Sequence, residues 1–351
     1  MLDTAPLTVQ HWWLLGGGFG IVFFGLQWLL QKKILREVQG SSHDPSVPPE
    51  GGPPPLGKGR KIYYGGSVLL ATVVFLAYFV LGNSWLMVGL SAAGLLVLLI
   101  GTIDENEALP PSHQLTWQLI AAGLVAVAGW TITHVSHPSG QGVLLVPGGI
   151  VLAVGWLVLL MNAINWLDGV DGLAPGVGAV ALLSIAAVAL LPSVQDSTTL
   201  ALALIGAGGA LSILLWNFPP AKIYLGTTGS WWLGLYIGAV AILGGGKIVT
   251  TLLVLAWPVA DALWVITQRL AAGRPPWQGG DEVHLHHKLL ARGLSPRSIT
   301  ALSMLATALL GFLAITLQTV DKAVGFLLVA ATVAVVSVLL TRAGPRATVS
   351  E

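Results

Sequence analysis

A short polar run from Asn162 to Ala174 separates two long apolar segments and holds two Asn, two Asp and two Gly in thirteen residues. These residues gather carboxylate acceptors, amide donors and adaptable backbone in one place. Asn, Asp and Gly are also the residues of ordinary turns, so the run by itself is compatible with a simple connection. Because the surrounding chain is so apolar, we expect a polar ligand to be bound here.

Three further clusters carry groups that can do chemistry. Asp104 and Glu105 are adjacent carboxylates at the end of an apolar segment, where one can accept a proton or the pair can attract Mg²⁺. The stretch 217–230 combines an amide, a lysine and a tyrosine with Gly and Thr, and the stretch 284–287 holds three histidines. The simpler alternatives are a solvated helix end for the acidic pair and a lipid-binding basic loop for the histidines.

The histidine cluster does not fit a structural zinc site. The chain has no cysteine and no nearby second motif that would complete four ligands. Histidines beside Arg269 and Arg274 are better suited to donate hydrogen bonds to a diphosphate.

Composition places the chain in a membrane. Hydrophobic residues make up 55% of the sequence, charged residues only 9%, and the mean hydropathy is +0.82. Eleven apolar segments have about the length that a helix needs to cross the hydrocarbon layer. We therefore predict a single all-α domain over residues 1–351, a polytopic integral membrane bundle of about 11 transmembrane helices. The expected spans are 12–30, 64–82, 85–103, 115–135, 148–165, 176–192, 200–216, 231–246, 248–266, 299–318 and 324–340.

The distribution of charge predicts the orientation. No Lys or Arg precedes the first span, which indicates an uncleaved segment with its N-terminus outside. With that start, fourteen of the sixteen Lys and Arg residues fall on the inner side, and only Lys247 and Lys322 fall outside. The C-terminal tail, 341–351, is then inside. The Pro, Gly and Ser-rich stretch 37–59 is expected to be a flexible cytoplasmic loop.

This topology brings the polar clusters to one membrane face, in the loops 104–114, 162–175, 217–230 and 267–298. Ion-coupled transporters place ionisable groups near the bilayer midplane, whereas here Asp261 is the only charged residue within an expected span. A site at the inner rim suits a water-soluble substrate that meets a lipid headgroup.

These motifs resemble those of the polyprenyl-phosphate N-acetylhexosamine-1-phosphate transferases. The similar segments are Asp104-Glu105 followed by Leu109-Pro110, the uninterrupted N-x-x-N-x-x-D-G-x-D-G-L run from Asn162, the segment 217–230, and His284-Leu-His286-His287. The resemblance implies that a polyprenyl phosphate attacks the sugar-linked phosphorus of a UDP-sugar, giving a lipid-pyrophosphoryl sugar and UMP. It also implies a requirement for Mg²⁺, with Mn²⁺ as the alternative ion.

The resemblance assigns roles to particular side chains. Catalytic roles fall on Asp104, Glu105, Asp168, His284, His286 and His287. Substrate contacts fall on Arg60, Asn162, Asn165, Gly169, Asp171, Asn217, Lys222, Tyr224, Arg269 and Arg274, with Tyr224 expected to stack on the base. The metal would be held by Asp168 and by position 227, where the family has an Asp and this chain has Thr227.

Three readings follow from this pattern. The first is an enzyme that transfers GlcNAc-1-phosphate, because H-L-H-H resembles that branch of the family. The second is the phospho-MurNAc-pentapeptide branch, which typically has three consecutive histidines. The third is a catalytically silent relative, since Thr227 removes an anionic metal ligand.

The expected partners are polyprenyl phosphate, a UDP-N-acetylhexosamine and membrane lipids, with no nucleic acid and with a homodimer left open. The resemblance implies the bacterial plasma membrane, with the active face towards the cytoplasm.

Overall fold

The structure is a computed structural model that describes Gly25 and residues 64–136, 142–144, 148–243, 248–278 and 284–342. The expected first span, apart from Gly25, lies outside the described residues. So do the loop 37–59, Arg60 and most of the C-terminal tail.

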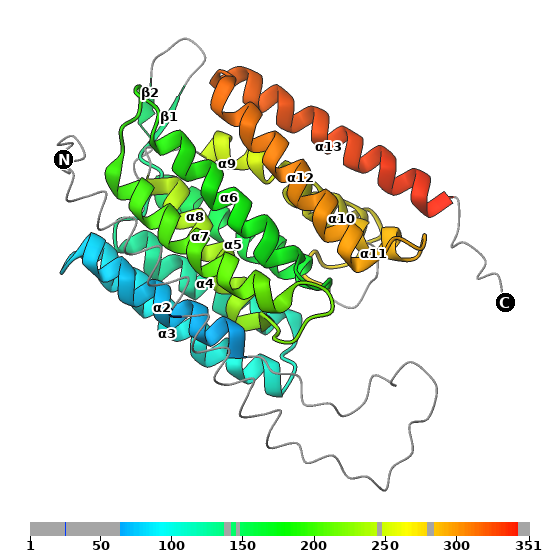
Figure 1. The fold of residues 1–351 in the computed structure, drawn as a ribbon, viewed down its shortest axis with the longest axis horizontal. Coiled ribbons are helices and arrows are strands. Elements are labelled where there is room, and N and C mark those ends of the chain that lie inside the picture. The colour runs from blue at the N-terminus through cyan, green and yellow to red at the C-terminus, as the bar shows by residue number, and fades with distance from the viewer. Residues whose placement is uncertain are drawn as a thin grey trace, which may run out of the picture.

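The described chain is a bundle of helices with one small hairpin (Figure 1). The first half contains α2 (Tyr64–Leu81), α3 (Trp85–Asn106), α4 (Pro111–Val127), α5 (Gly148–Leu167), α6 (Leu173–Ala189) and α7 (Ser197–Asn217). The second half contains α8 (Gly226–Leu243), α9 (Ile248–Val254), α10 (Ala256–Ala271), α11 (Leu285–Leu290), α12 (Pro296–Thr316) and α13 (Thr319–Arg342). The hairpin pairs β1 (His134–Ser136) with β2 (Gly142–Leu144) in antiparallel register.

The described helices are those of a multi-pass membrane protein. Five of them, α3, α5, α7, α12 and α13, are long and apolar enough to cross a bilayer. The bent pair α9 and α10 brings the number to six when it is taken as one span, and α2 and α6 are shorter apolar helices. The eleven spans and their orientation remain predictions.

Most ends of the described helices lie within about five residues of the expected spans, and two segments differ more. The segment 248–266 is not one straight helix, because α9 and α10 meet at an angle of 86°. Pro258 provides the cause: a helix running through this point would set its ring against the carbonyl of Val254, the last residue of α9. The helix expected over 115–135 begins earlier, at Pro111, and ends at Val127, before Gly129 with φ +114° and the strand β1.

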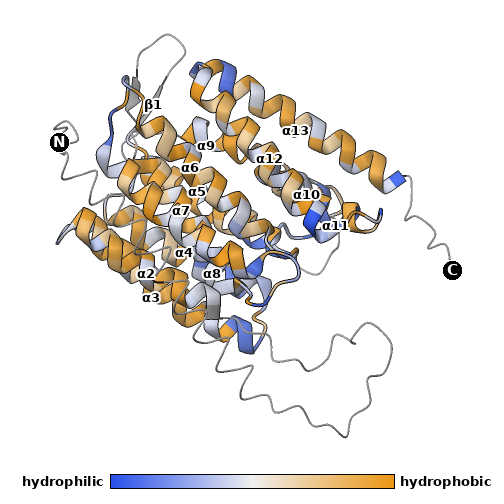
Figure 2. Ribbon diagram, in the orientation of Figure 1, coloured by the Kyte–Doolittle hydropathy of each residue, from blue (hydrophilic) through white to orange (hydrophobic). Residues whose placement is uncertain are grey.

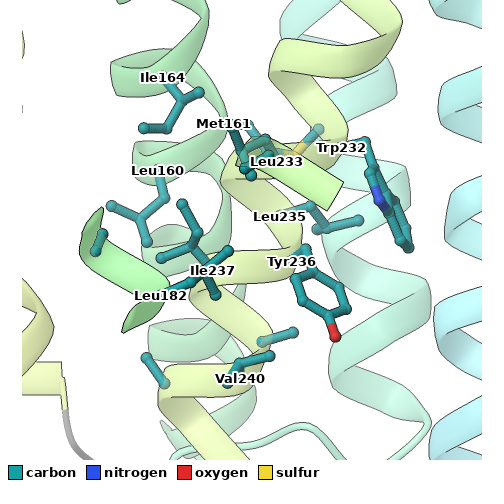
Figure 3. Packing of buried hydrophobic residues seen from close by; sticks show 14 of the residues in the cluster. Leu160, Met161, Ile164, Leu182, Trp232, Leu233, Leu235, Tyr236, Ile237 and Val240 are labelled. Carbon is teal, nitrogen blue, oxygen red and sulfur yellow. The ribbon is translucent and has the colours of Figure 1, made fainter. Parts of the chain in front are cut away.

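The core is built around α8, which packs on α2, α3, α5 and α7. Trp231, Trp232 and Tyr236 of this helix are almost fully buried, and the Tyr236 hydroxyl donates a hydrogen bond to the Leu202 carbonyl at 2.7 Å. Figure 3 shows α8 side chains meeting those of α5 in this core. Gly234 permits the close approach, because a Cβ there would lie 2.7 Å from the Cα of Met161.

Hydrophilic residues gather at one end of this apolar bundle, around the end of α3 and at α11 (Figure 2). The helices α3, α5, α7 and α10 end there, and α8 begins there. Segments that are far apart in the chain are thereby brought together at the polar end.

Candidate active site

The acidic pair lies in the last turn of α3 and contacts the start of α8. Asp104 Oδ1 accepts hydrogen bonds from Leu109 N and Gln114 Nε2, both at 2.9 Å. Asp104 Oδ2 accepts one from Thr227 Oγ1 at 2.6 Å, and Glu105 Oε1 accepts one from Thr228 N at 2.9 Å. The two carboxylates therefore join α3 to the segment that carries Thr227.

Asp168 follows the end of α5 and faces the same region. Burial raises the pKa of its carboxyl well above the ordinary range, and the charges of Asp171 and Glu105 raise it further, while a backbone hydrogen bond from Gly226 opposes the shift. A bound cation would relieve this accumulation of negative charge.

The loops after α5 and α7 are held together by Asp171 and Asn217. Asp171 Oδ2 accepts a hydrogen bond from Ala221 N at 2.9 Å. Asn217 is buried, and its side chain accepts from Gly172 N at 2.7 Å and donates to the Ile223 carbonyl at 2.8 Å. Since these bonds connect backbone segments, both side chains shape the site as well as lying near it.

Tyr224 and Lys222 border these loops. Tyr224 is half-buried, and burial raises the pKa of its hydroxyl, with the charge of Asp171 adding to the effect. Lys222 is exposed, and its ammonium lies 5.7 Å from the centre of the Trp216 ring.

The histidines lie at and within α11. His284 precedes the helix, and its Nδ1 lies 2.8 Å from Oδ2 of Asp261. His286 is 1% exposed, and neither ring nitrogen has a hydrogen-bond partner among the described residues. Burial lowers the pKa of His286 to about 3, with the charges of His287 and His284 adding and that of Asp261 opposing. His286 is therefore neutral near pH 7, with one ring N–H to donate.

Gly169 connects the carboxylates to the histidines. A Cβ at this position would lie 3.2 Å from Nε2 of His286 and 3.4 Å from Nε2 of His287. The backbone directly after Asp168 thus lies against both rings. The acidic and histidine segments are two walls of one site.

A groove of about 580 Å³ opens beside this site between α4, α5 and α10. Its lining is mostly apolar, with Asn162, Gln114 and Trp166 among its residues. The centre of the Trp166 ring lies 5.1 Å from the centre of the His284 ring and 5.3 Å from the guanidinium carbon of Arg269. The groove therefore ends next to the polar groups.

The remaining predicted residues lie around these walls. Asn162 donates to Gln118 Oε1 at 2.6 Å, and Asn165 accepts from Ser230 Oγ at 2.7 Å. Arg269 is buried and donates to the Pro276 carbonyl at 2.8 Å, whereas Arg274 is exposed.

The oxygen atoms around position 227 fit a magnesium ion that also binds the substrate. Mg²⁺ is commonly held by one or two carboxylates together with substrate phosphates. Asp168, Glu105 and the Thr227 hydroxyl supply only oxygen atoms. Burial is the main cause of the raised pKa of Asp168, and the nearby charges of Asp171 and Glu105 add to it. Within the described ranges, no three His, Cys, Asp or Glu side chains form a ready-made metal cluster.

Several residues that organise the site have no role predicted from the sequence. Gln114 and Gln118 bind Asp104 and Asn162, and their spacing of four in an apolar helix was a usable signal. Trp166 and Thr228 had no such signal, because their roles depend on which segments meet. Asp261 was visible as a lone charge in an apolar span, but its partner His284 is 23 residues away.

The fold and the site together define a multi-pass membrane protein with a polar site at one end of its bundle. The family model described as glycosyl transferase family 4 matches residues 87–245. The phospho-N-acetylmuramoyl-pentapeptide-transferase of Gloeothece citriformis is 31% identical over 84% of this chain and 82% of its own length. The chain belongs to glycosyl transferase family 4.

Two bacterial relatives are similar over a shorter part. The probable undecaprenyl-phosphate N-acetylglucosaminyl 1-phosphate transferase of Bacillus subtilis is 32% identical over 65% of this chain and 63% of its own length. The decaprenyl-phosphate N-acetylglucosaminephosphotransferase of Mycolicibacterium smegmatis is 31% identical over 63% of this chain and 60% of its own length. The chain thus spans less than two thirds of the length of these two relatives.

Proposed function

We propose that this protein transfers a sugar 1-phosphate, GlcNAc-1-phosphate in the leading reading, from a UDP-sugar to polyprenyl phosphate. UMP is released, and the product starts cell-envelope glycan synthesis at the cytoplasmic face of the bacterial plasma membrane. Family membership and the names of the relatives from B. subtilis and M. smegmatis support this reaction class.

The observation that carries the proposal is the position of Gly169 between the acidic residues and the histidines. A diphosphate transfer needs cation-binding or proton-accepting groups on one side and hydrogen-bond donors on the other. Here His286, which is buried and has no hydrogen-bond partner among the described residues, lies against the backbone beside Asp168. The adjoining groove ends at Trp166, where an apolar chain could lie with its phosphate towards the site.

In the proposed reaction, an oxygen of the polyprenyl phosphate bonds to the sugar-linked phosphorus, and the bond from that phosphorus to the UMP oxygen breaks. Glu105 takes the proton of the acceptor phosphate when that phosphate is singly ionised. His286 donates its ring N–H to the diphosphate, with His287 beside it at a ring distance of 4.3 Å. The loops joined by Asn217 hold the nucleotide, and Tyr224 stacks on the base.

Magnesium is proposed as the cofactor, with Mn²⁺ as a substitute. When bound, the ion would neutralise diphosphate charge as the phosphorus is transferred. Asp168 and Thr227 are the residues of this chain that would hold it. Thr227 supplies a neutral oxygen, so the substrate phosphates must carry more of the binding.

The test is UMP release by the purified full chain with Mg²⁺, undecaprenyl phosphate and a panel of UDP-sugars. We expect release with UDP-GlcNAc that depends on both the lipid and the metal. Tight UDP-sugar binding without any UMP release would instead identify a silent relative.

A second candidate is the phospho-MurNAc-pentapeptide transfer reaction. It is favoured by the extent of the match to the G. citriformis relative, which covers more of the chain than the matches to the GlcNAc transferases. UDP-MurNAc-pentapeptide therefore belongs in the same panel. Release with this donor alone would select the second candidate.

A further inference from the structure

Asp261 is a carboxylate buried in the body of α10, and it is the only charged residue in the stretch 248–266. Its side chain is only 3% exposed, and that of His284 is 7% exposed. An ionisable group in an apolar span is costly unless it is paired, and it commonly marks a functional site. The proposed reaction does not use Asp261 directly, so its presence requires another explanation.

Both oxygens of Asp261 bind the start of the histidine segment. Oδ2 lies 2.8 Å from Nδ1 of His284, and Oδ1 accepts a hydrogen bond from the Leu285 backbone N–H at 2.9 Å. A carboxylate accepts hydrogen bonds, so this contact places a proton on Nδ1 of His284. The Nε2 atom is then the nitrogen left for the site.

The α11 helix needs such support because it contains only six residues. A helix this short is not stable by itself, so contacts with other elements must set its direction. At its far end, Arg292 donates to the Leu340 carbonyl of α13 at 2.9 Å. Asp261 fixes the near end, which carries the histidines.

The contacts continue from Asp261 into the site. The rings of His284 and His286 are stacked with 5.7 Å between their centres and 9° between their planes. His286 in turn lies against Gly169. Rotation of His284 would therefore disturb the ring that faces the backbone beside Asp168.

We propose that Asp261 is a positioning residue for the transferase reaction: it fixes the tautomer and orientation of His284 and, through stacking, the placement of His286. This inference rests on the proposed function. Asp261 itself does not contact the substrate.

The test compares Asp261→Asn with the wild-type full chain in detergent. Asparagine keeps an oxygen for Leu285 N–H, but its amide group can donate to Nδ1 of His284 and so favours the opposite tautomer. We expect the ¹⁵N resonances of His284, assigned with His284→Gln, to change from the Nδ1–H to the Nε2–H form. We expect kcat to fall about 10- to 100-fold, the usual effect of losing a group that orients a functional histidine.

A double-mutant cycle separates positioning from general stability. In the His284→Ala background, adding Asp261→Asn should change kcat by less than about twofold, because the partner through which it acts is gone. Asp196→Asn is the matched control, since Asp196 is an N-cap carboxylate that binds Thr199 at the start of α7. It should leave both kcat and the His284 resonances unchanged.

Several results would overturn the proposal. One is a wild-type His284 in the Nε2–H form at neutral pH, which needs no folded variant to be observed. Another is Asp261→Asn with wild-type kcat, or with an equal further loss in the His284→Ala background. A wild type that releases no UMP would refute the proposed function alone, whereas the tautomer would still show whether Asp261 orients His284.

Discussion

The Thr227 hydroxyl donates a hydrogen bond to Asp104 across 2.6 Å, linking the start of α8 to the last turn of α3. The resemblance to the transferases implies an Asp at this position, which would place a carboxylate where this chain has a donor. The hydrogen bond therefore satisfies Asp104 without a metal, and the same contact would become repulsive if a second carboxylate replaced the hydroxyl.

Thr227→Asp is expected to make the protein bind Mg²⁺ more tightly and turn over faster. A hard cation gains more from a carboxylate than from a hydroxyl. We expect UMP release to rise and the Mg²⁺ concentration for half-maximal rate to fall by about tenfold, which corresponds to roughly 1.4 kcal/mol. Without Mg²⁺, the variant should have a lower Tm than the wild type, because Asp104 then faces a like charge.

Thr227→Asn is the control for this change, since it alters shape and hydrogen bonding without adding charge. It should not lower the Mg²⁺ requirement. An active wild type with an unimproved Thr227→Asp variant would mean that Asp104, Glu105 and Asp168 already provide a sufficient site.

His286→Ala and His287→Ala are each expected to reduce kcat by two or more orders of magnitude. Removing a preorganised donor to a developing charge has about this effect. Gel filtration and Tm in detergent should show that both variants remain folded. His113→Ala changes an exposed histidine at the start of α4 and should keep the wild-type rate. Near-native turnover in both site variants would reduce α11 to a membrane-surface element.

The pH dependence of stability is expected to follow His286. Its pKa is about 3 in the folded protein and about 6.5 in an unfolded chain, so the unfolded state binds more protons between these values. The part of the free energy of unfolding that depends on neutral His286 is therefore fully present above about pH 6.5. It is lost as the pH falls towards 3, and the loss is roughly 1–2 kcal/mol at pH 5.

The measurement is Tm as a function of pH for the wild type and His286→Gln. The variant should lose less stability than the wild type between pH 6.5 and 5. His113→Gln should behave like the wild type, because His113 is exposed in both states. Parallel curves for all three proteins would contradict the assignment.

Local patterns were sufficient to predict much of the helical content. Long apolar runs predict α3, α5 and α7 nearly as observed, because helices that span a membrane need an apolar composition over a fixed length. Hydropathy does not predict the break between α9 and α10, because it does not report helix direction, although Pro258 lies in this stretch. The four polar segments could be predicted to share one face from topology alone.

The pairings within that face could not be predicted from the sequence. Thr227 with Asp104 joins residues 123 positions apart, and Gly169 with His286 depends on how α11 packs. Such contacts follow from tertiary packing, for which a single sequence has no periodic signal. An isolated charge such as Asp261 indicates a functional role in the sequence. The sequence does not identify the partner of that charge.

Gly169→Ala is expected to separate the two walls of the site. The added methyl group would lie 3.2 Å from Nε2 of His286, closer than ordinary van der Waals contact, so the ring or the backbone beside Asp168 must shift. A displacement of this kind in a preorganised site is expected to lower kcat about 10- to 100-fold.

Gly123→Ala is the matched control, because a Cβ at this helical position has no atom within 4 Å. It should keep the wild-type rate with an equal or slightly higher Tm. If Gly169→Ala also kept that rate, the contact between Gly169 and the histidines would not matter for turnover, and the single-site arrangement proposed here would be wrong.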